Sequence, residues 1–415
     1  MATVLFREYQ PGLAGCSTRV MIALGLGPAI GLVAAAVAVG ATTIAGPQAT
    51  DWLSRHWARP LAPQGPPPAR FSELERSLAP ESCGACHPAQ FTDWKSSLHA
   101  ASMGPGVAGQ LTEMWRSDPE SARLCLSCHA PLAEQVPGSP AFDAGLQAKG
   151  LVCAACHVRN HERFGPPRRD GSLDPSVPRE SLPHNGVVRT PAFRAAEFCS
   201  SCHQFEPDGF ALNGKLLENT YAEWKASPAA AQGRQCQDCH MPDRRHLWRG
   251  IHDRDTVASA VRISLETERP RYRPGEDVRA TLIVANVGAG HYLPTYVTPR
   301  LLVRLALVDA SGRELRGSAE EHPIGREVTL DLSREIRDNR IPPGGHARFV
   351  YTRRVARAGL RLVATVTVEP DHFYTRFFES LLQAGAGAGT PDIRTALHAS
   401  RRSSFQIFNR TIPLT

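Results

Sequence analysis

The sequence predicts a multidomain α+β protein of 415 residues, and three observations support that prediction. Residues 20–46 are apolar and uncharged, over a length that spans a bilayer as one transmembrane helix. Residues 80–255 hold ten of the eleven cysteines among Pro- and Gly-rich loops and short helical periodicities. Residues 256–370 alternate apolar and polar positions between turn signals, which indicates antiparallel strands.

We expect residues 20–46 to form a single transmembrane anchor, with a cytoplasmic tail over residues 1–19. The stretch is longer than a usual signal-peptide core, although Ala-Val-Ala at 36–38 would fit a cleavage site. Secretion after signal cleavage therefore stays open as the alternative. The few arginines on either side hardly orient the segment.

Residues 47–79 are predicted to be a Pro-rich spacer that holds the next domain off the membrane. Trp52 and Trp57 suggest an interfacial turn at the headgroups. Cys16 ends a Leu-Ala-Gly-Cys sequence typical of lipoproteins, but that sequence precedes the apolar stretch instead of following it. We interpret it as a chance match and Cys16 as a free cytoplasmic thiol.

The ten remaining cysteines form five copies of one pattern, Cys-x-x-Cys-His, whose first cysteines lie 42, 28, 46 and 37 residues apart. The pattern is the attachment signature of c-type haem, in which two thioethers bind the porphyrin and the histidine binds the iron. A single copy might be a zinc site or a redox dithiol, but five identical copies leave covalent haem. The motifs are Cys83/Cys86/His87, Cys125/Cys128/His129, Cys153/Cys156/His157, Cys199/Cys202/His203 and Cys236/Cys239/His240.

The sequence thus predicts a pentahaem cytochrome c domain over residues 80–255, with five covalently bound haem c groups. Haem c is attached outside the cytoplasmic membrane, so the domain is expected in the periplasm, tethered to the inner membrane. The formal net charge of +7 is largely offset by the haem propionates, to about −3 with ferrous and about +2 with ferric iron. The composition therefore gives no case for nucleic-acid binding.

Each iron has a sixth position, and histidine there gives a six-coordinate electron carrier, whereas an open position permits substrate chemistry. Eleven of the sixteen histidines lie outside the motifs. The best-placed candidates for iron ligands are His99, His184, His246, His252 and His291, and the alternative for each is a hydrogen bond to a propionate.

Other candidates are weaker. His161 follows a motif by four residues and would serve a neighbouring haem, and His56 lies too near the predicted anchor. We expect His322, His346 and His398 to be surface histidines. His372, Met103 and Met114 are weak candidates for iron ligands, and Met241 is expected to pack against its neighbours.

Residues 90–103 are predicted to be helical because Phe91, Trp94 and Leu98 recur at helical spacing. Residues 91–97 (FTDWKSS) resemble residues 221–227 (YAEWKAS). A weak internal repeat and two unrelated amphipathic helices both remain open.

Residues 256–370 are expected to form an immunoglobulin-like antiparallel β-sandwich without a disulfide. Residues 371–415 are expected to hold a helix at 371–383, a second at 391–400 and a final strand at 405–414. His291 lies in a Gly-rich loop that could project toward a haem. Ligation there would dock the sandwich rigidly, and otherwise the sandwich would be a separate docking module.

Four segments carry a family resemblance: CGACHPAQFTDWKSSLHA, FCSSCHQF, CQDCHMP and NVGAGHYLPT. They resemble the multihaem c-type cytochrome superfamily that includes the tetrahaem electron acceptor of hydroxylamine oxidoreductase, over roughly residues 80–300. The resemblance implies bis-histidine haems stacked in close pairs, with His99, His184 and His291 as distal ligands. This chain departs from that family in having five motifs, a predicted anchor and a long C-terminal extension.

The leading hypothesis is electron transfer between a respiratory or periplasmic donor and an acceptor, without catalytic residues. Expected partners are a quinol-oxidising complex, a periplasmic dehydrogenase or a soluble cytochrome. One alternative is a reductase or oxidase of a small nitrogen or sulfur compound at a five-coordinate haem, although no Cys-x-x-Cys-Lys variant and no acid–base constellation occur. Another is a docking subunit of a larger electron-transfer complex.

Overall fold

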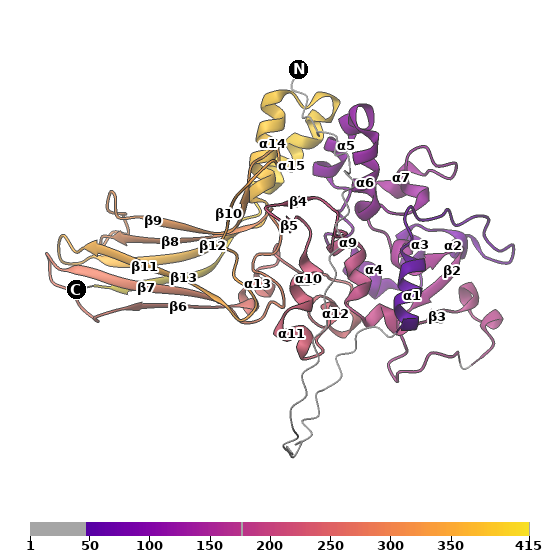
Figure 1. Cartoon of the computed structure of the whole chain (residues 1–415), viewed down its shortest axis with the longest axis horizontal. Coiled ribbons are helices and arrows are strands. Elements are labelled where there is room, and N and C mark those ends of the chain that lie inside the picture. Colours follow the sequence, from indigo (N-terminus) through magenta and orange to yellow (C-terminus); the bar gives the residue numbers. More distant parts are fainter. Residues whose placement is uncertain (1–46, 176, 415) are drawn as a thin grey trace, which may run out of the picture. The chain divides into compact units, whose positions relative to one another are not determined.

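The computed structural model describes residues 47–175 and 177–414 (Figure 1). The predicted tail, anchor, cleavage site and Cys16 lie outside the described residues. Within them, no helix is both long and apolar enough to cross a bilayer.

The Cys-rich part consists of short helices joined by loops (Figure 1). Proline often occupies the first turn, where its missing N–H costs nothing. The α-helices are α1 Pro47–His56, α2 Glu73–Arg76, α3 Pro80–Gly84, α4 Pro88–Lys95, α5 Pro105–Ser117, α6 Pro119–His129, α7 Ala144–Gln147, α8 Cys153–His157, α9 Glu197–His203, α10 Thr220–Lys225, α11 Pro228–Ala231, α12 Cys236–His240 and α13 Arg254–Ala260.

Short strands and single 3-10 turns connect these helices. The strands are β1 Val158–Arg159, β2 Glu162–Gly165, β3 Val188–Arg189, β4 Ala211–Leu212 and β5 Lys215–Leu216. The 3-10 turns here are Ala133–Gln135, Arg179–Ser181, Pro183–Asn185, Pro191–Arg194 and Pro242–Arg244.

The segment expected to be a free spacer instead packs on the Cys-rich part. Leu53, Leu61 and Phe71 are buried. The ring of Trp52 in α1 lies 5.7 Å from that of Phe193. The apolar side chains assigned to a membrane interface are thus satisfied by protein contacts, and the interpretation of residues 47–79 as a stand-off spacer is corrected.

The helix expected over residues 90–103 is shorter than predicted. α4 ends at Lys95, and the hydroxyls of Ser96 and Ser97 donate to the carbonyls of the preceding turn. Leu98, placed on the buried face by the helical spacing, is 54% exposed. Serine competes for backbone hydrogen bonds and favours such an end.

Residues 261–369 supply seven strands of two antiparallel sheets that share one core (Figure 1). One sheet has the order β10-β9-β8-β12-β13, in which β13 is Phe405–Pro413, and the other has the order β11-β7-β6. Alternate side chains of β7 and β12 enter that core, as expected for a sheet covered on one face. The strands are β6 Val261–Thr267, β7 Asp277–Asn286, β8 Arg300–Val308, β9 Glu320–Val328, β10 Glu335–Asp338, β11 His346–Arg354 and β12 Arg361–Glu369.

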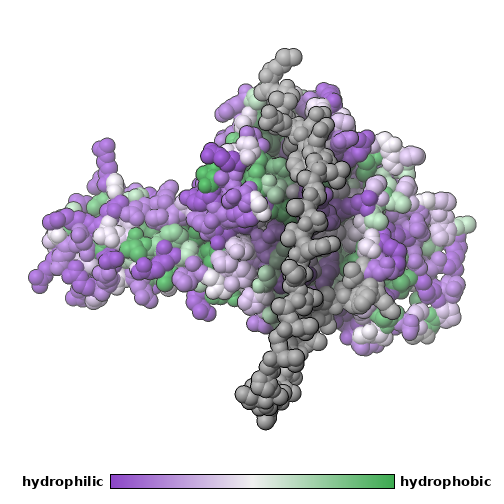
Figure 2. Space-filling model, viewed as in Figure 1, coloured by the Kyte–Doolittle hydropathy of each residue, from purple (hydrophilic) through white to green (hydrophobic). Residues whose placement is uncertain are grey.

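The prediction of antiparallel β-structure at this end of the chain is confirmed. Figure 2 shows mainly hydrophilic residues, with scattered apolar ones, on the visible face of these strands. The charged outer face and apolar inner face explain why the alternation was visible in the sequence.

The C-terminal segment from residue 371 packs partly against the Cys-rich part and partly against the sandwich. The helices α14 His372–Ala384 and α15 Thr390–Ser400 are linked by the 3-10 turn Gly387–Gly389, and β13 Phe405–Pro413 pairs with β12. α15 and the turn before it contact α5, where a Cβ at Gly389 would lie 2.1 Å from the Gly109 carbonyl oxygen. The two glycines therefore permit a backbone contact that side chains would prevent.

Arg326 on β9 ties the sandwich to the Cys-rich part. Its buried guanidinium pairs with Glu335 at 2.8 Å and donates to the carbonyls of Leu212, Lys215 and Leu216. Five donors in a fixed fork suit Arg to such a buried set of acceptors. These buried hydrogen bonds thus hold the β4–β5 hairpin against the sandwich.

Candidate functional site

The motif histidines stand at helix ends. α6, α8, α9 and α12 each end at the histidine of a motif, and the first motif lies across α3 and the start of α4. Three of these histidines direct Nδ1 to a backbone carbonyl: His129 to Ser102 at 2.7 Å, His157 to Phe164 at 2.8 Å and His240 to Arg249 at 2.6 Å. A Nδ1–H that donates leaves the Nε2 lone pair for a metal.

Three of the predicted partner histidines have the same arrangement. The distances from Nδ1 to the carbonyl oxygen are 3.1 Å from His184 to Gly186, 3.0 Å from His246 to Arg244 and 2.9 Å from His291 to Tyr292. Their Nε2 atoms are therefore also left available for a metal.

Three imidazole pairs face one another at nearly equal separations. Ring centroids lie 6.4 Å apart for His99 and His203, 6.2 Å for His157 and His246, and 6.3 Å for His240 and His291. Two metal–imidazole bonds of about 2 Å in line, plus the two ring radii, give a separation of about 6 Å. Each pair therefore fits a six-coordinate iron between its two rings.

His184 is the candidate partner for the first motif, although no ring contact among the described residues pairs it with His87. This histidine lies in a strained turn, with φ of 44° at His184 and 63° at Asn185. Its backbone N–H donates to Glu75 at 2.6 Å, and that bond, with two from Ser72, holds the pKa of Glu75 at about 2. His87 is close enough to lower the pKa of His184, after the larger effect of burial.

Burial lowers the pKa values of five more of these imidazoles. It lowers the pKa of His99 to about 3 and that of His157 to about 4. The same cause lowers the pKa values of His203, His246 and His291. Neutral imidazole is the form that binds a metal, so the electrostatics agree with the geometry.

The first and second motifs differ from the other three. Among the described residues, no ring contact pairs His87 or His129 with another histidine. Met103 packs in the apolar cluster that includes Cys125. Tyr374 of α14 lies near Cys125, and Glu218 lies near Cys128.

The motifs approach one another through their cysteines. The thiols of Cys83 and Cys153 are close enough to shift each other's pKa. The same holds for Cys128 with Cys202 and for Cys199 with Cys236. Groups attached at the first and third, second and fourth, and fourth and fifth motifs would consequently be neighbours.

The third and fourth motifs are neighbours as well. Cys156 raises the pKa of the nearby Cys199 thiol, although a hydrogen bond from that thiol to Cys236 and burial have the larger effects. Arg59 donates to the sulfurs of Cys128 at 3.3 Å and Cys202 at 3.0 Å. All five motifs therefore form one connected cluster.

The two similar heptapeptides have the same structural role. Trp94 and Trp224 are buried and donate through Nε1 to the carbonyls of Leu151 and Arg234. In each case the acidic residue before the tryptophan is buried and accepts a backbone N–H from a partner-histidine loop. Asp93 accepts that of His246 at 3.0 Å, and Glu223 accepts that of Tyr292, next to His291, at 3.1 Å.

Each acidic residue also binds an arginine. Arg245 holds Asp93 through two bonds of 2.7 and 2.6 Å, and Arg340 holds Glu223 at 2.8 Å. The Arg245 hydrogen bonds and the His246 N–H keep the pKa of Asp93 low. The conformational match supports the internal repeat over two unrelated helices.

His252, predicted as an iron ligand, is placed elsewhere. Its Nε2 bonds to Asp371 at 3.0 Å, so the nitrogen that would bind iron is already engaged. We therefore correct this assignment. Its position after the fifth motif was the only signal in its favour.

The weaker candidates also have other contacts. Nε2 of His56 bonds to the Cys156 carbonyl at 2.9 Å, and that of His161 bonds to the Gly65 carbonyl at 2.9 Å. His56 is only 4% exposed, so burial rather than proximity to a membrane describes its setting. His372 pairs with Glu369, and His346 and His398 are exposed.

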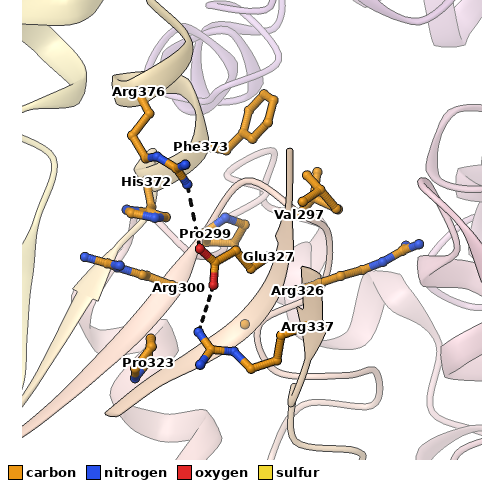
Figure 3. A pocket seen from close by; sticks show the side chains of 12 residues that line it. Val297, Pro299, Arg300, Pro323, Arg326, Glu327, Arg337, His372, Phe373 and Arg376 are labelled. Carbon is orange, nitrogen blue, oxygen red and sulfur yellow. Dashed lines mark hydrogen bonds and ion pairs between the residues drawn. The ribbon is translucent and has the colours of Figure 1, made fainter. Parts of the chain in front are cut away.

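A separate cleft lies where β8 and β9 meet α14 (Figure 3). Glu327 points into it and binds Arg337 at 2.9 Å and Arg376 at 4.0 Å. None of the residues that line it is a cysteine or a histidine of the five motifs. The cleft is therefore distinct from the motif cluster.

Sequence and structure comparisons point to one class of protein. The family model "Cytochrome c554 and c-prime" matches residues 82–158, which hold the first three motifs. Cytochrome c-554 of Nitrosomonas europaea is 27% identical over 132 residues, 29% of this chain and 54% of the relative. The chain thus spans about half the length of this relative.

One solved structure shares the fold over most of the chain. A penta-heme cytochrome c552 from Thermochromatium tepidum covers 83% of this chain and 100% of its own, with a TM-score of 0.59 and 19% identity. Coverage of that extent includes strands of the sandwich as well as the Cys-rich part.

Replacing Asp93 or Glu223 with alanine should perturb two different histidine pairs. Each variant leaves a backbone N–H beside a partner histidine without its charged acceptor, a loss on the order of 2 kcal/mol. We expect D93A to alter the low-spin ferric resonance of the His157–His246 site and E223A that of the His240–His291 site. Electron paramagnetic resonance of the oxidised protein measures both.

The exposed Asp208 supplies the control variant D208A, which should leave every resonance in place. Identical spectra for D93A, E223A and D208A would contradict a positioning role for these carboxylates.

Proposed function

We propose that this chain, a multihaem c-type cytochrome with covalently bound haem c, carries five haems and transfers electrons between a donor and an acceptor protein. The observation that carries the proposal is the three pairs of facing imidazoles, whose ring centroids lie 6.2–6.4 Å apart. Two imidazoles fill both axial positions of an iron and leave no site for a substrate, which suits an electron carrier.

The residues have distinct tasks. The ten motif cysteines would hold the porphyrins by thioethers, and His87, His129, His157, His203 and His240 would bind from the near side. His99, His184, His246 and His291 would bind from the far side of four irons. When bound, haem supplies one-electron exchange between ferric and ferrous states, and the protein fixes the order and spacing of the steps.

The contacts between motifs suggest a route. They connect the first motif to the third, the third to the fourth, and the fourth to the second and fifth. Cys86 of the first motif and Cys239 of the fifth are exposed, whereas the other motif cysteines are half-buried. We assign electron entry and exit to these two ends and a branch to the second motif.

We further place the protein in the periplasm, joined to the inner membrane through residues 20–46. Redox partners of the expected kinds are a quinol-oxidising complex, a periplasmic dehydrogenase or a soluble cytochrome. The superfamily that includes the tetrahaem electron acceptor of hydroxylamine oxidoreductase remains our choice of relationship, supported by the match to cytochrome c-554 over the first three motifs.

The purified protein should store five electrons per chain and release them rapidly to a soluble c-type cytochrome. Coulometric reduction gives the electron count, and stopped-flow mixing of the reduced protein with oxidised cytochrome gives the rate. Fewer than five electrons would refute the haem count. Complete reduction without transfer to any soluble cytochrome or quinol-oxidising membrane fraction would refute the carrier role.

Deleting residues 1–46 behind a cleavable secretion signal should move the protein from washed membranes to the soluble periplasmic fraction with its haem content unchanged. The expected cause is loss of the apolar stretch that we propose as an anchor. Haem staining of the two fractions measures the result. Recovery of the full-length chain in the soluble fraction would instead support signal cleavage.

A second function, reduction of a small ligand at the second motif, is favoured by one observation. The histidines whose pKa values His129 affects, His99 and His203, face each other, while Tyr374 and the buried Glu218 lie near the cysteines of the second motif. An iron with one imidazole keeps a position for substrate.

The oxidised protein is therefore expected to show one high-spin haem that binds carbon monoxide when reduced. Difference absorption spectra and electron paramagnetic resonance measure it, with the low-spin haems of the same sample as an internal control. An entirely low-spin protein that takes up no carbon monoxide would exclude this function.

A further inference from the structure

Glu218 is a buried carboxyl with incomplete hydrogen bonding. It follows β5 and has no exposed surface. Oε1 accepts the hydroxyl of Thr220 at 3.0 Å, and Oε2 has no partner among the described residues. A carboxyl in this setting is costly to ionise and gains stability by carrying a proton.

The position of Glu218 relates it to the second and fourth motifs. Its carbonyl accepts the N–H of Phe205, just after the fourth motif, at 2.9 Å. Cys128 of the second motif is near enough to affect its ionisation. A change of charge on a haem held by Cys125 and Cys128 would therefore act on Glu218 through protein of low dielectric constant.

Hydroxyl groups connect Glu218 to a partly exposed ion-pair network. Thr220 Oγ1 lies 2.8 Å from Thr295 Oγ1, which donates to Glu223 at 3.1 Å. Each hydroxyl has a single proton, so only two of the three contacts between Glu218 and Glu223 are hydrogen bonds while both carboxyls are ionised. Rotation of the hydroxyls would be needed to pass a proton along this line.

The network continues to the surface. Arg340 joins Glu223 to Asp338, and Asp338 binds Lys215 at 2.7 Å. The Lys215 side chain is 37% exposed. The buried carboxyl thus has a continuous polar connection to solvent through residues of both the Cys-rich part and the sandwich.

We propose that Glu218 is a redox-linked proton acceptor, taking up one proton when one electron enters the haem attached at Cys125 and Cys128. This rests on the proposed haem attachment and electron-transfer function. The step is balanced: iron passes from ferric to ferrous with an electron from the donor protein, and the carboxylate with one proton from solvent becomes a carboxylic acid. Oxidation reverses both changes, so the net charge around the second motif stays constant.

The groups that face Glu218 support this assignment. Burial has the largest effect and raises its pKa to about 8, against which the Thr220 hydrogen bonds act. Cys128 from α6 becomes an uncharged thioether on haem attachment, and Glu223 from α10 is neutralised by Arg340. Arg326 from β9 donates its hydrogen bonds to Glu335 and to the carbonyls of the β4–β5 hairpin. A carboxyl that titrates near neutral pH responds to the charge of the haem.

The test measures haem midpoint potentials against pH in the holoprotein, by spectroelectrochemistry with mediators. In the wild type, one potential should fall as pH rises through neutrality, by up to about 59 mV per unit for one proton per electron. Glu218→Gln, which cannot ionise, should make that potential independent of pH at its low-pH value. Glu218→Asp keeps a carboxyl and should keep a slope. The exposed Glu206, changed to glutamine, controls for net charge and should leave the slope intact.

Infrared difference spectra give a second measurement. The reduced-minus-oxidised spectrum should show the carbonyl band of a protonated carboxyl in the wild type and in Glu206→Gln, and lack it in Glu218→Gln. An unchanged slope and band in Glu218→Gln, or a wild type with no pH-dependent potential, would overturn the proposal. Mediators replace the partner proteins, so a failure of electron transfer to partners would not affect this outcome.

Discussion

The constraint on which this structure depends is the orientation of the imidazoles in the motif cluster. A histidine serves as an axial ligand only if it is neutral and if Nε2 faces the metal, and a hydrogen bond from Nδ1 to a backbone carbonyl secures the second condition. Six histidines of the cluster have such a bond, and none of the carbonyls belongs to a long helix or strand of the sandwich. Irregular loops with free carbonyls are therefore a requirement of the site, which explains why the Cys-rich part has so little regular structure.

A related demand explains the connection between the two parts of the chain. His291 comes from the loop after β7, whereas its partner His240 ends α12. The loop is fixed on the other side by Glu223, whose carboxylate receives the Tyr292 N–H and the Arg340 guanidinium. Buried ion pairs contribute little net stability, but they define one geometry because an unpaired alternative is costly. The sandwich therefore acts as part of the site.

The sequence predicted those features that depend on local patterns. Cys-x-x-Cys-His fixes the attachment chemistry by spacing alone, and the alternation in residues 261–369 reports a sheet with one covered face. His252 was misassigned because proximity in sequence to the fifth motif does not determine where its ring points; Asp371, 119 residues away, engages it. The packing of α1 was likewise beyond a local pattern, since a tryptophan beside an apolar stretch suits a membrane interface and a protein core equally well. Asp93 and Glu223 had a visible signal, the shared acidic-Trp-Lys sequence, but their role required the loops that they hold.

The second motif shows how the remainder of the chain can make one haem site different from its neighbours. Three motifs have an imidazole from a loop facing their own histidine. The second has α14 on one side, with Tyr374, and the segment after β5 on the other, with Glu218. Both residues lie far from the motif in sequence and belong to elements whose positions depend on the sandwich: α14 follows β12, and Arg326 holds the β4–β5 hairpin. An ionisable group without exposed surface is costly, and a structure that needed only packing would have an apolar residue at position 218. Its place beside a motif without a facing histidine among the described residues is explained if charge at that motif changes during function, because a changing charge gives a buried, titratable carboxyl an advantage over an apolar side chain of similar size.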